Sequence, residues 1–390
     1  MTAIAKGSTG ERLWFLDWVR VGAFGLLILY HVGMYHWEGE AWHVKARHQT
    51  ELLDYTQALL YPWRLSLLFF IAGVASRFML DRMGGSAFAG SRLSRLGIPL
   101  IFGMVVVCAP QAYVEGLYKG ALEPGWWAFW GRYLGFDPTL EQHFTWNHLW
   151  FVVYLLVYSL VLAALASPLT RAAHALDRSG LFARPLPMVL LPALAVGAAY
   201  AALRSHFPST HALVDDWTNH ASYASMVLLG YLLARNQGFW AAAERVRWGT
   251  AAIFLLVYLA FLGLDWMPDD MRQQWRPVIR VVFKLQAWCA ILAILGFARR
   301  HLNRPHPAVA YLNEAVFPYY IVHQTIIVVL GWWFLSRDFH PLVEWLALVA
   351  LTAAGCALTF VLARRSGPLR PLFGLRAERP AARGLAAGHS

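Results

Sequence analysis

The sequence predicts an all-α membrane protein, a polytopic bundle of about ten transmembrane helices with both termini in the cytoplasm. Of its 390 residues, 58% are hydrophobic and 14% are charged, whereas soluble domains carry about 25% charged residues. The apolar residues form long runs, such as 155–166 and 343–358. Those runs exclude a soluble globular enzyme, and because they do not alternate with polar residues they disfavour a membrane β-barrel.

Ten segments contain the roughly 20 mainly apolar residues that a membrane-spanning helix needs. The expected spans are 13–36, 56–80, 96–118, 148–167, 186–203, 220–236, 248–265, 276–298, 309–334 and 343–363. The fifth and sixth of these are short. The first carries ionisable residues and no small-residue cleavage site, so we expect a permanent membrane helix there rather than a cleaved signal peptide.

The basic residues predict which side of the membrane each loop occupies. With the N-terminus inside, 21 of the 33 Lys and Arg residues lie on the cytoplasmic side and eight on the opposite side, as the positive-inside rule requires. The net charge of +11 then favours contact with anionic lipid rather than with nucleic acid. We expect residues 1–363 to form the membrane domain and residues 364–390 to form a basic, disordered cytoplasmic tail.

Asp17, Arg20 and His31 in the first span are the main candidate functional residues, because ionisable side chains inside a span are costly and usually functional. Arg20 and His31 are 11 residues apart, which puts them on one helix face about 16 Å apart along the axis. Asp17 precedes Arg20 by three residues and can pair with it. Histidine titrates near neutral pH, so His31 is a candidate general base. The alternative is a structural Asp17–Arg20 pair with a packing role for His31.

Arg92 and Arg95 form a second candidate site just before the third expected span. Their spacing puts both guanidinium groups on one side of an expected helix start. A helix N-terminus offers free N–H groups to a phosphate, and arginine binds phosphate with two parallel hydrogen bonds. The pair therefore suits a phosphate-bearing cytosolic ligand such as coenzyme A, with ordinary positive-inside charge as the alternative.

Several short motifs in this order resemble the acyltransferase 3 family of integral membrane acyltransferases, which includes polysaccharide O-acetylases and a periplasmic glucan succinyltransferase. The motifs are Arg20-x10-His31, Phe69-Phe-Ile-Ala-Gly, Arg92-x-x-Arg95, Trp146-Asn-His-Leu-Trp-Phe-Val and Asn313-Glu-Ala-Val-Phe-Pro-Tyr-Tyr-Ile-Val-His-Gln-Thr. The last two are similar to the glucan-acyltransferase branch. The resemblance covers nearly all of residues 11–363, and ten spans match the family's core.

The resemblance implies transfer of an acetyl or succinyl group from cytosolic acyl-coenzyme A to a hydroxyl of an extracytoplasmic glycan or glucan. It implies acyl-CoA as co-substrate, a glycan acceptor and membrane lipid as partners, and the bacterial cytoplasmic (inner) membrane as location. Arg20 and His31 would be the essential first-span pair, with Asp17 beside them, and Arg92 and Arg95 would bind the donor. A covalent acyl-histidine relay is the alternative to direct transfer.

The ninth expected span holds further candidates. His323 lies about 14 residues from its cytoplasmic start, about 21 Å deep, where it could act with His31 or simply bond a neighbouring helix. Gln324 is a candidate substrate contact. Asn313 and Glu314 are candidate donor contacts, although Asn313 could equally be a helix cap.

On the outer side, Lys284, Trp146 and His148 are candidate acceptor contacts. Lys284 lies deep in the eighth expected span, and indole rings suit the faces of sugars. The aromatic belt of membrane proteins explains the same tryptophans. We predict no metal site, because the histidines of the first outer loop lack carboxylate or cysteine partners for a convincing ligand set.

A secondary transporter or flippase is the rival function. Proton-coupled transport would use the same buried Asp, Arg and His residues. The sequence shows no paired Gly- or Pro-broken helices at matching positions of two halves, a pattern that many transporters have.

Overall fold

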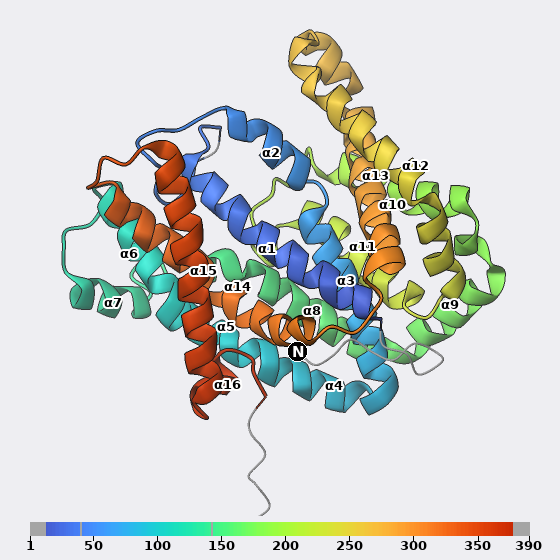
Figure 1. The fold of residues 1–390 in the computed structure, drawn as a ribbon, viewed down its shortest axis with the longest axis horizontal. Helices are drawn as coiled ribbons and strands as arrows, with labels where there is room; N and C mark the ends of the chain where they lie inside the picture. Colours follow the sequence, from blue (N-terminus) through green and yellow to red (C-terminus); the bar gives the residue numbers. More distant parts are fainter. Residues whose placement is uncertain (1–12, 40, 142, 377–390) are drawn as a thin grey trace, which may run out of the picture.

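The computed structural model describes residues 13–39, 41–141 and 143–376, and most of these residues are helical (Figure 1). The α-helices are α1 (Trp14–His36), α2 (Leu52–Leu60), α3 (Arg64–Met83), α4 (Gly85–Arg92), α5 (Ile98–Phe102), α6 (Cys108–Tyr118), α7 (Trp126–Leu134), α8 (Trp150–Ala164), α9 (Ala166–Ser179), α10 (Pro185–Leu203), α11 (Trp217–Leu233), α12 (Gln237–Leu262), α13 (Asp269–Leu302), α14 (Pro307–Phe334), α15 (Pro341–Arg365) and α16 (Leu369–Leu372). Shorter helical turns are η1 (Leu93–Gly97), η2 (Gly103–Val107), η3 (Asn147–Leu149), η4 (Leu181–Ala183) and η5 (Leu264–Trp266).

Nine helices in the described part of the chain are long and apolar enough to cross a membrane. This confirms the predicted polytopic helical bundle. The remaining expected span, 220–236, corresponds to α11, which has 17 residues. Three of the long helices, α10, α14 and α15, begin with a proline, where the missing N–H has no helical partner to lose.

Two local structures differ from the expected ones. The expected third span, 96–118, is the second part of a helix that begins at Gly85 and continues through the π-helical turns η1 and η2. In addition, α9 forms where a loop was expected between the fourth and fifth spans. Its apolar residues recur at helical spacing opposite its charged ones, which is typical of a surface helix.

The expected disordered tail is helical and packed in its first part. α15 continues to Arg365 and α16 follows, and Phe373 and Leu375 are buried. The Phe373 ring is 5.3 Å from that of Phe102 in α5. The prediction of disorder is therefore wrong through Arg376, because these apolar side chains pack against the bundle. Residues 377–390 of the predicted tail lie outside the described residues.

α3 and α11 pack against each other at very short range. A Cβ atom added to Gly73 would lie 2.0 Å from the Val227 carbonyl oxygen, and one added to Gly230 would lie 2.0 Å from that of Phe70. Small residues allow membrane helices to approach this closely, which favours their association without a hydrophobic driving force. This pair forms a tightly packed support within the bundle.

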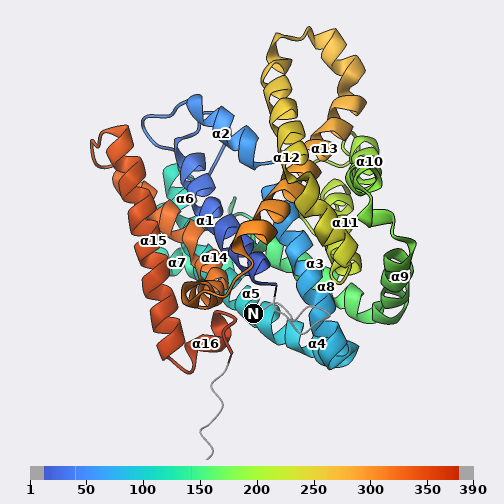
Figure 2. The ribbon, with the colours of Figure 1, turned by 45° about the vertical axis from the view of Figure 1, so that its right-hand side comes forward.

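The α12–α13 hairpin projects beyond the other helices (Figures 1 and 2). α13 has 34 residues, about 51 Å of helix, whereas the hydrocarbon core of a bilayer is about 30 Å thick. The start of α1 and the short helix α16 lie at the opposite end of the molecule (Figure 1). We refer to these two ends as the hairpin end and the tail end.

Candidate active site

His31 and His323 face each other across the contact between α1 and α14, with ring centroids 5.0 Å apart. The Nδ1–H of His31 donates to the Leu27 carbonyl at 2.9 Å, and that of His323 donates to the Tyr320 carbonyl at 2.7 Å. A neutral imidazole that donates from Nδ1 carries its lone pair on Nε2. Both rings therefore offer a proton-accepting nitrogen, and the buried Nε2 of His323 has no hydrogen-bond partner among the described residues.

Arg64, the first residue of α3, lies beside this histidine pair. Its guanidinium carbon is 3.5 Å from the centroid of the Tyr30 ring, and that ring is 5.6 Å from the ring of His31. Arg64 is 3% exposed, and its Nε and Nη1 have no hydrogen-bond partner among the residues described. Buried donors without partners are costly, so these two N–H groups are available to a ligand oxygen.

A hydrogen-bonded network holds His148 next to His323, with 5.5 Å between the ring centroids. His148 donates from Nε2 to the Ile321 carbonyl at 3.0 Å and accepts at Nδ1 from Gln111 at 3.2 Å. Gln324 donates to Gln111 Oε1 at 3.1 Å. Both nitrogens of His148 and the Gln324 amide are thus used within the protein, so these two expected substrate contacts form the wall behind His323.

A second polar group lies on the same two helices, nearer the tail end. Asn313 donates from Nδ2 to Asp17 Oδ1 at 2.7 Å, and Arg20 Nη2 is 3.9 Å from the same oxygen. The buried carboxylate therefore connects α1 to α14. The alternative role of Asn313 as a helix cap is wrong, because α14 begins at Pro307 and the side chain of His306 caps it.

An apolar cavity of about 160 Å³ separates the two polar groups and is walled by α1 and α14. Its lining extends from Val21 and Leu312 to Ile28 and His323, a length of about 10 Å along α1. The cavity therefore has the shape to hold an apolar chain whose end reaches the histidine pair.

Arg92 lies at the tail end and is directed into the bundle, with 4% exposure. It donates to the Met79 sulfur at 3.2 Å and to Ser76 Oγ at 3.5 Å, while its buried Nε has no partner within the described ranges. Its charge interacts with those of Arg95 and Arg20. Three arginines thus concentrate positive charge below the apolar cavity.

Arg95 is half-buried and lines a separate cavity of about 760 Å³ together with Arg376 of the tail. The expectation that a helix start would offer free N–H groups here is wrong. The turn η1 continues α4 without a break, so these N–H groups lie inside a helix. Anion binding at this point depends on the guanidinium groups alone.

Three other expected site residues lie elsewhere. Glu314 pairs with Arg364 at 3.5 Å and Arg370 at 3.9 Å, on the side of α14 that faces the tail. Lys284 Nζ lies 3.9 Å from the centroid of the Tyr200 ring. Trp146 donates its indole N–H to the His211 carbonyl at 3.0 Å. These contacts place Glu314, Lys284 and Trp146 in the protein framework rather than at the histidine pair.

From the sequence, Arg64 was ambiguous between a ligand contact and a side chain that extends toward the membrane interface, and Gln111 was assigned no role, yet both lie at the site. Each is a polar residue within an expected span, which is the same signal that identified Asp17. Their functional importance becomes evident only from their neighbours, Tyr30 for Arg64 and His148 for Gln111.

Comparison with known proteins gives a family match and distant relatives. Residues 13–364 match the family model described as an acyltransferase domain. Glucans biosynthesis protein C of Escherichia coli O6:K15:H31 (strain 536 / UPEC) is 23% identical over 372 residues, which cover 90% of this chain and 89% of that protein. The protein of the same name from Escherichia coli strain K12 is 23% identical over 370 residues, with the same coverage. No solved structure matches.

Proposed function

Because this chain belongs to the acyltransferase family whose model matches residues 13–364, we propose that it moves an acetyl or succinyl group from acyl-coenzyme A to a glucan hydroxyl outside the cytoplasm. That the chain is a multi-pass membrane acyltransferase follows from the family and the helices. The printed name of its relatives, glucans biosynthesis protein C, supports a glucan acceptor. The observation that carries the proposal is the apolar cavity between α1 and α14, which begins next to Arg20 at Val21 and ends at His323 of the histidine pair.

In this proposal the tail end faces the cytoplasm of a bacterium and the bundle lies in its inner membrane. The phosphates of acyl-coenzyme A bind at Arg92 and Arg95, because arginine forks recognise phosphate. The buried Nε of Arg92 supports this role, since a phosphate oxygen would satisfy it. Arg20 and Asp17 keep the entrance polar and position the donor rather than react with it.

The acyl arm of the donor then extends from Arg20 through the apolar cavity between α1 and α14. The apolar lining of the cavity favours the uncharged part of this arm, and the unpartnered Nε2 of His323 at its end can accept a hydrogen bond from an N–H group of the arm. Holding the thioester next to the acceptor hydroxyl makes a bimolecular reaction effectively unimolecular, and this supplies much of the rate enhancement.

His31 acts as the general base. Its Nε2 takes the proton of the glucan hydroxyl while the hydroxyl oxygen attacks the thioester carbonyl carbon. The ester C–O bond forms, the C–S bond breaks, and the proton passes from His31 to the leaving thiolate of coenzyme A. The ring of His323, centred 5.0 Å away, offers its Nε2 lone pair to an N–H or O–H group of a bound substrate.

Arg64 stabilises the oxyanion that forms during this attack. Donors fixed in a water-poor site before the reaction are among the largest contributors to catalysis. The unpartnered Nε and Nη1 of Arg64 fit this role, and stacking on Tyr30 keeps the guanidinium in place.

The deciding experiment uses His31→Gln protein in nanodiscs and measures release of free coenzyme A thiol that depends on added glucan. Loss of a general base should lower this rate about 10²- to 10⁴-fold, with unchanged binding of acyl-coenzyme A. His143→Ala, at an exposed histidine of the loop before η3, should keep the wild-type rate. A His31→Gln variant with the wild-type rate would overturn the proposal.

The acyl-histidine relay makes a different prediction from direct transfer. Incubation with radiolabelled acyl donor and no acceptor should leave the protein unlabelled if transfer is direct. A stable label that disappears when glucan is added would establish the relay instead.

A further inference from the structure

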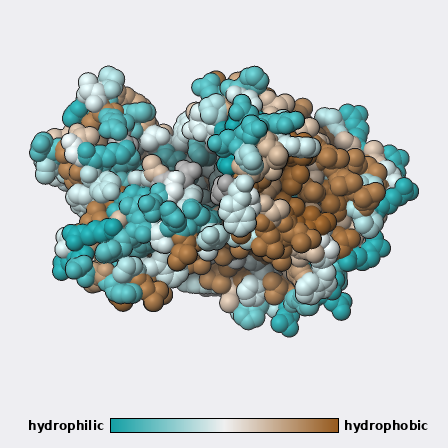
Figure 3. Space-filling model, turned by 90° about the horizontal axis from the view of Figure 1, so that it is seen from above, coloured by the Kyte–Doolittle hydropathy of each residue, from teal (hydrophilic) through white to brown (hydrophobic). Residues whose placement is uncertain are grey.

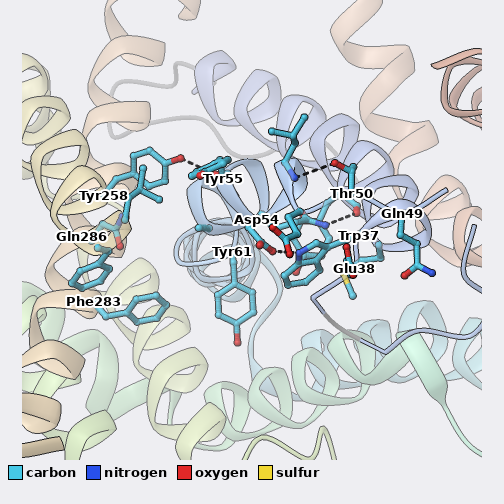
Figure 4. Close-up of a pocket in the computed structure, with 18 of the residues that line it drawn as sticks. Trp37, Glu38, Gln49, Thr50, Asp54, Tyr55, Tyr61, Tyr258, Phe283 and Gln286 are labelled. Atoms are coloured by element: carbon cyan, nitrogen blue, oxygen red, sulfur yellow. Dashed lines mark hydrogen bonds between the residues drawn. The ribbon is translucent and has the colours of Figure 1, made fainter. Parts of the chain in front are cut away.

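A cavity of about 1250 Å³ opens at the hairpin end, between α2 and the α12–α13 hairpin (Figure 4). Seen from this end, the surface is hollowed between a mostly hydrophilic lobe and a lobe with a broad hydrophobic area (Figure 3). Pockets for small ligands usually measure about 300–1,000 Å³. The cavity is therefore large enough for a ligand of several linked units.

Aromatic rings line this cavity on opposite sides. Tyr258 and Phe283 lie on the side of the hairpin, Trp37 lies on the other side, and Tyr61 lies between them (Figure 4). The Tyr258 hydroxyl donates to the Tyr55 carbonyl at 2.9 Å, which connects α12 to α2. Aromatic faces carry partial negative charge and attract the weakly positive C–H groups on the faces of sugar rings.

One buried polar atom in the cavity lacks a partner. Gln286 of α13 lines the cavity and is 1% exposed. Its Oε1 has no hydrogen-bond partner among the described residues. A buried acceptor that is left unsatisfied is unfavourable, and a hydroxyl group can donate to it. This atom points to a ligand rich in hydroxyl groups.

The charges in the lining favour a neutral ligand. The acidic lining residues are Glu38, Glu51 and Asp54, and the strongly basic one is Arg204. His211 also lines the cavity, and burial lowers the pKa of this histidine, so it is neutral at pH 7. The carboxylates therefore outnumber the cations, which disfavours a polyanion.

The cavity leads toward the histidine pair. Tyr30 lines it, and the Tyr30 ring is 5.6 Å from the ring of His31. Gln57, which also lines the cavity, donates from Nε2 to the Tyr30 carbonyl at 3.2 Å. A ligand that fills the cavity therefore contacts Tyr30, whose ring lies next to that of His31, the proposed general base.

We infer that this cavity binds the acceptor as a neutral oligosaccharide. Its sugar rings pack on Phe283, Tyr61 and Trp37, and one of its hydroxyls donates to Gln286 Oε1. The reaction at the end of the bound saccharide rests on the proposed function, whereas the binding itself does not. The cavity determines which glycan is accepted.

The test measures binding of linear glucose oligosaccharides of increasing length to the protein in nanodiscs, by calorimetry and without any acyl donor. Gln286→Met keeps the side-chain volume and removes the acceptor, and it should weaken binding about tenfold. Phe283→Ala should also weaken binding. Trp127→Ala is the matched control, because Trp127 lies on α7 and is 76% exposed; it should bind as the wild type does.

Wild-type binding in both cavity variants, each with the wild-type unfolding temperature, would overturn the inference. So would weaker binding in Trp127→Ala alone. A protein that binds oligosaccharide in this pattern but releases no acceptor-dependent thiol would contradict only the proposed function. In the transfer assay, Gln286→Met should raise the KM for the glucan about tenfold and leave the KM for the acyl donor unchanged.

Discussion

Two helix pairs within this bundle pack in opposite ways. α3 and α11 approach until a Cβ on Gly73 or Gly230 would lie 2.0 Å from a carbonyl oxygen of the other helix. α1 and α14 instead leave an apolar cavity of about 160 Å³ between two buried polar groups. No side-chain atom fits at these two glycines between α3 and α11. Between α1 and α14, by contrast, there is a cavity, and the buried Nε2 of His323 at its end lacks a hydrogen-bond partner among the described residues.

This contrast shows that the cavity proposed for the substrate, between α1 and α14, lies in the same bundle as the tightly packed pair of α3 and α11. Arg64 is the first residue of α3, so the close packing of α3 on α11 fixes the position of the guanidinium beside His31. His31 on α1 and His323 on α14 therefore lie beside an arginine, Arg64, whose position is fixed by this packing. Substitutions in the first pair should therefore affect folding, and substitutions in the second should affect transfer.

The largest effect is expected from Gly230→Ala. Its new Cβ would overlap the Phe70 carbonyl, which should cost at least about 3 kcal/mol, the upper range for overpacking a core. Thermal unfolding followed by size-exclusion chromatography measures the loss. Gly22→Ala is the control, because no atom lies within 4 Å of a Cβ at that position. Equal stability of the two variants would contradict the described packing of α3 on α11.

The next largest effect is expected from Gly25→Leu, which adds a side chain at the lining of the apolar cavity. A Cβ at Gly25 meets nothing within 4 Å, so the fold should remain intact. Displacing the acyl arm by an ångström or more should reduce transfer about 10²-fold. Gly22→Leu, equally unobstructed but outside the cavity lining, should retain the wild-type rate. If both variants are fully active, the acyl arm does not use this cavity.

A smaller effect is expected from Asn313→Leu, which removes the hydrogen bond between α14 and Asp17. A bond to a charged group contributes about 1.5–3 kcal/mol, so the unfolding free energy should fall by that amount. A double-mutant cycle with Asp17→Asn isolates the pair. Additive effects in the cycle would mean that the contact contributes nothing by itself.

The smallest effect is expected from Glu314→Gln, on the side of α14 that faces the tail. Its ion pairs with Arg364 and Arg370 are partly exposed, and such pairs contribute up to about 1 kcal/mol. The unfolding temperature should drop slightly and transfer should be unchanged, with Glu123→Gln at an exposed position as the control. A strong loss of transfer would restore the earlier expectation that Glu314 binds the donor.

Helical periodicity alone predicted that Arg20 and His31 share one face of the first span with Asp17 beside them, because spacing along one helix is a local property. Asp17 and His31 both contact α14, as that face requires. The helix that starts at Gly85 was not predicted, since residues 85–95 are mostly small or polar and their contact with α8 cannot be read from the local sequence. The cavity around Gln286 was beyond prediction as well. It forms because α2 lies across from the α12–α13 hairpin, and Tyr55 and Tyr258, which join the two, are 203 residues apart in sequence.

The apolar cavity also affects how the protein should be handled. Gly25 in its lining is exposed and Ile28 is half-buried on the outer surface of α1, where the hydrocarbon of a bilayer or micelle makes contact. An aliphatic detergent tail has the same chemistry as the arm that we place there. We therefore expect long-chain detergents to act as competitive inhibitors, and assays in lipid discs to give higher turnover than assays in micelles.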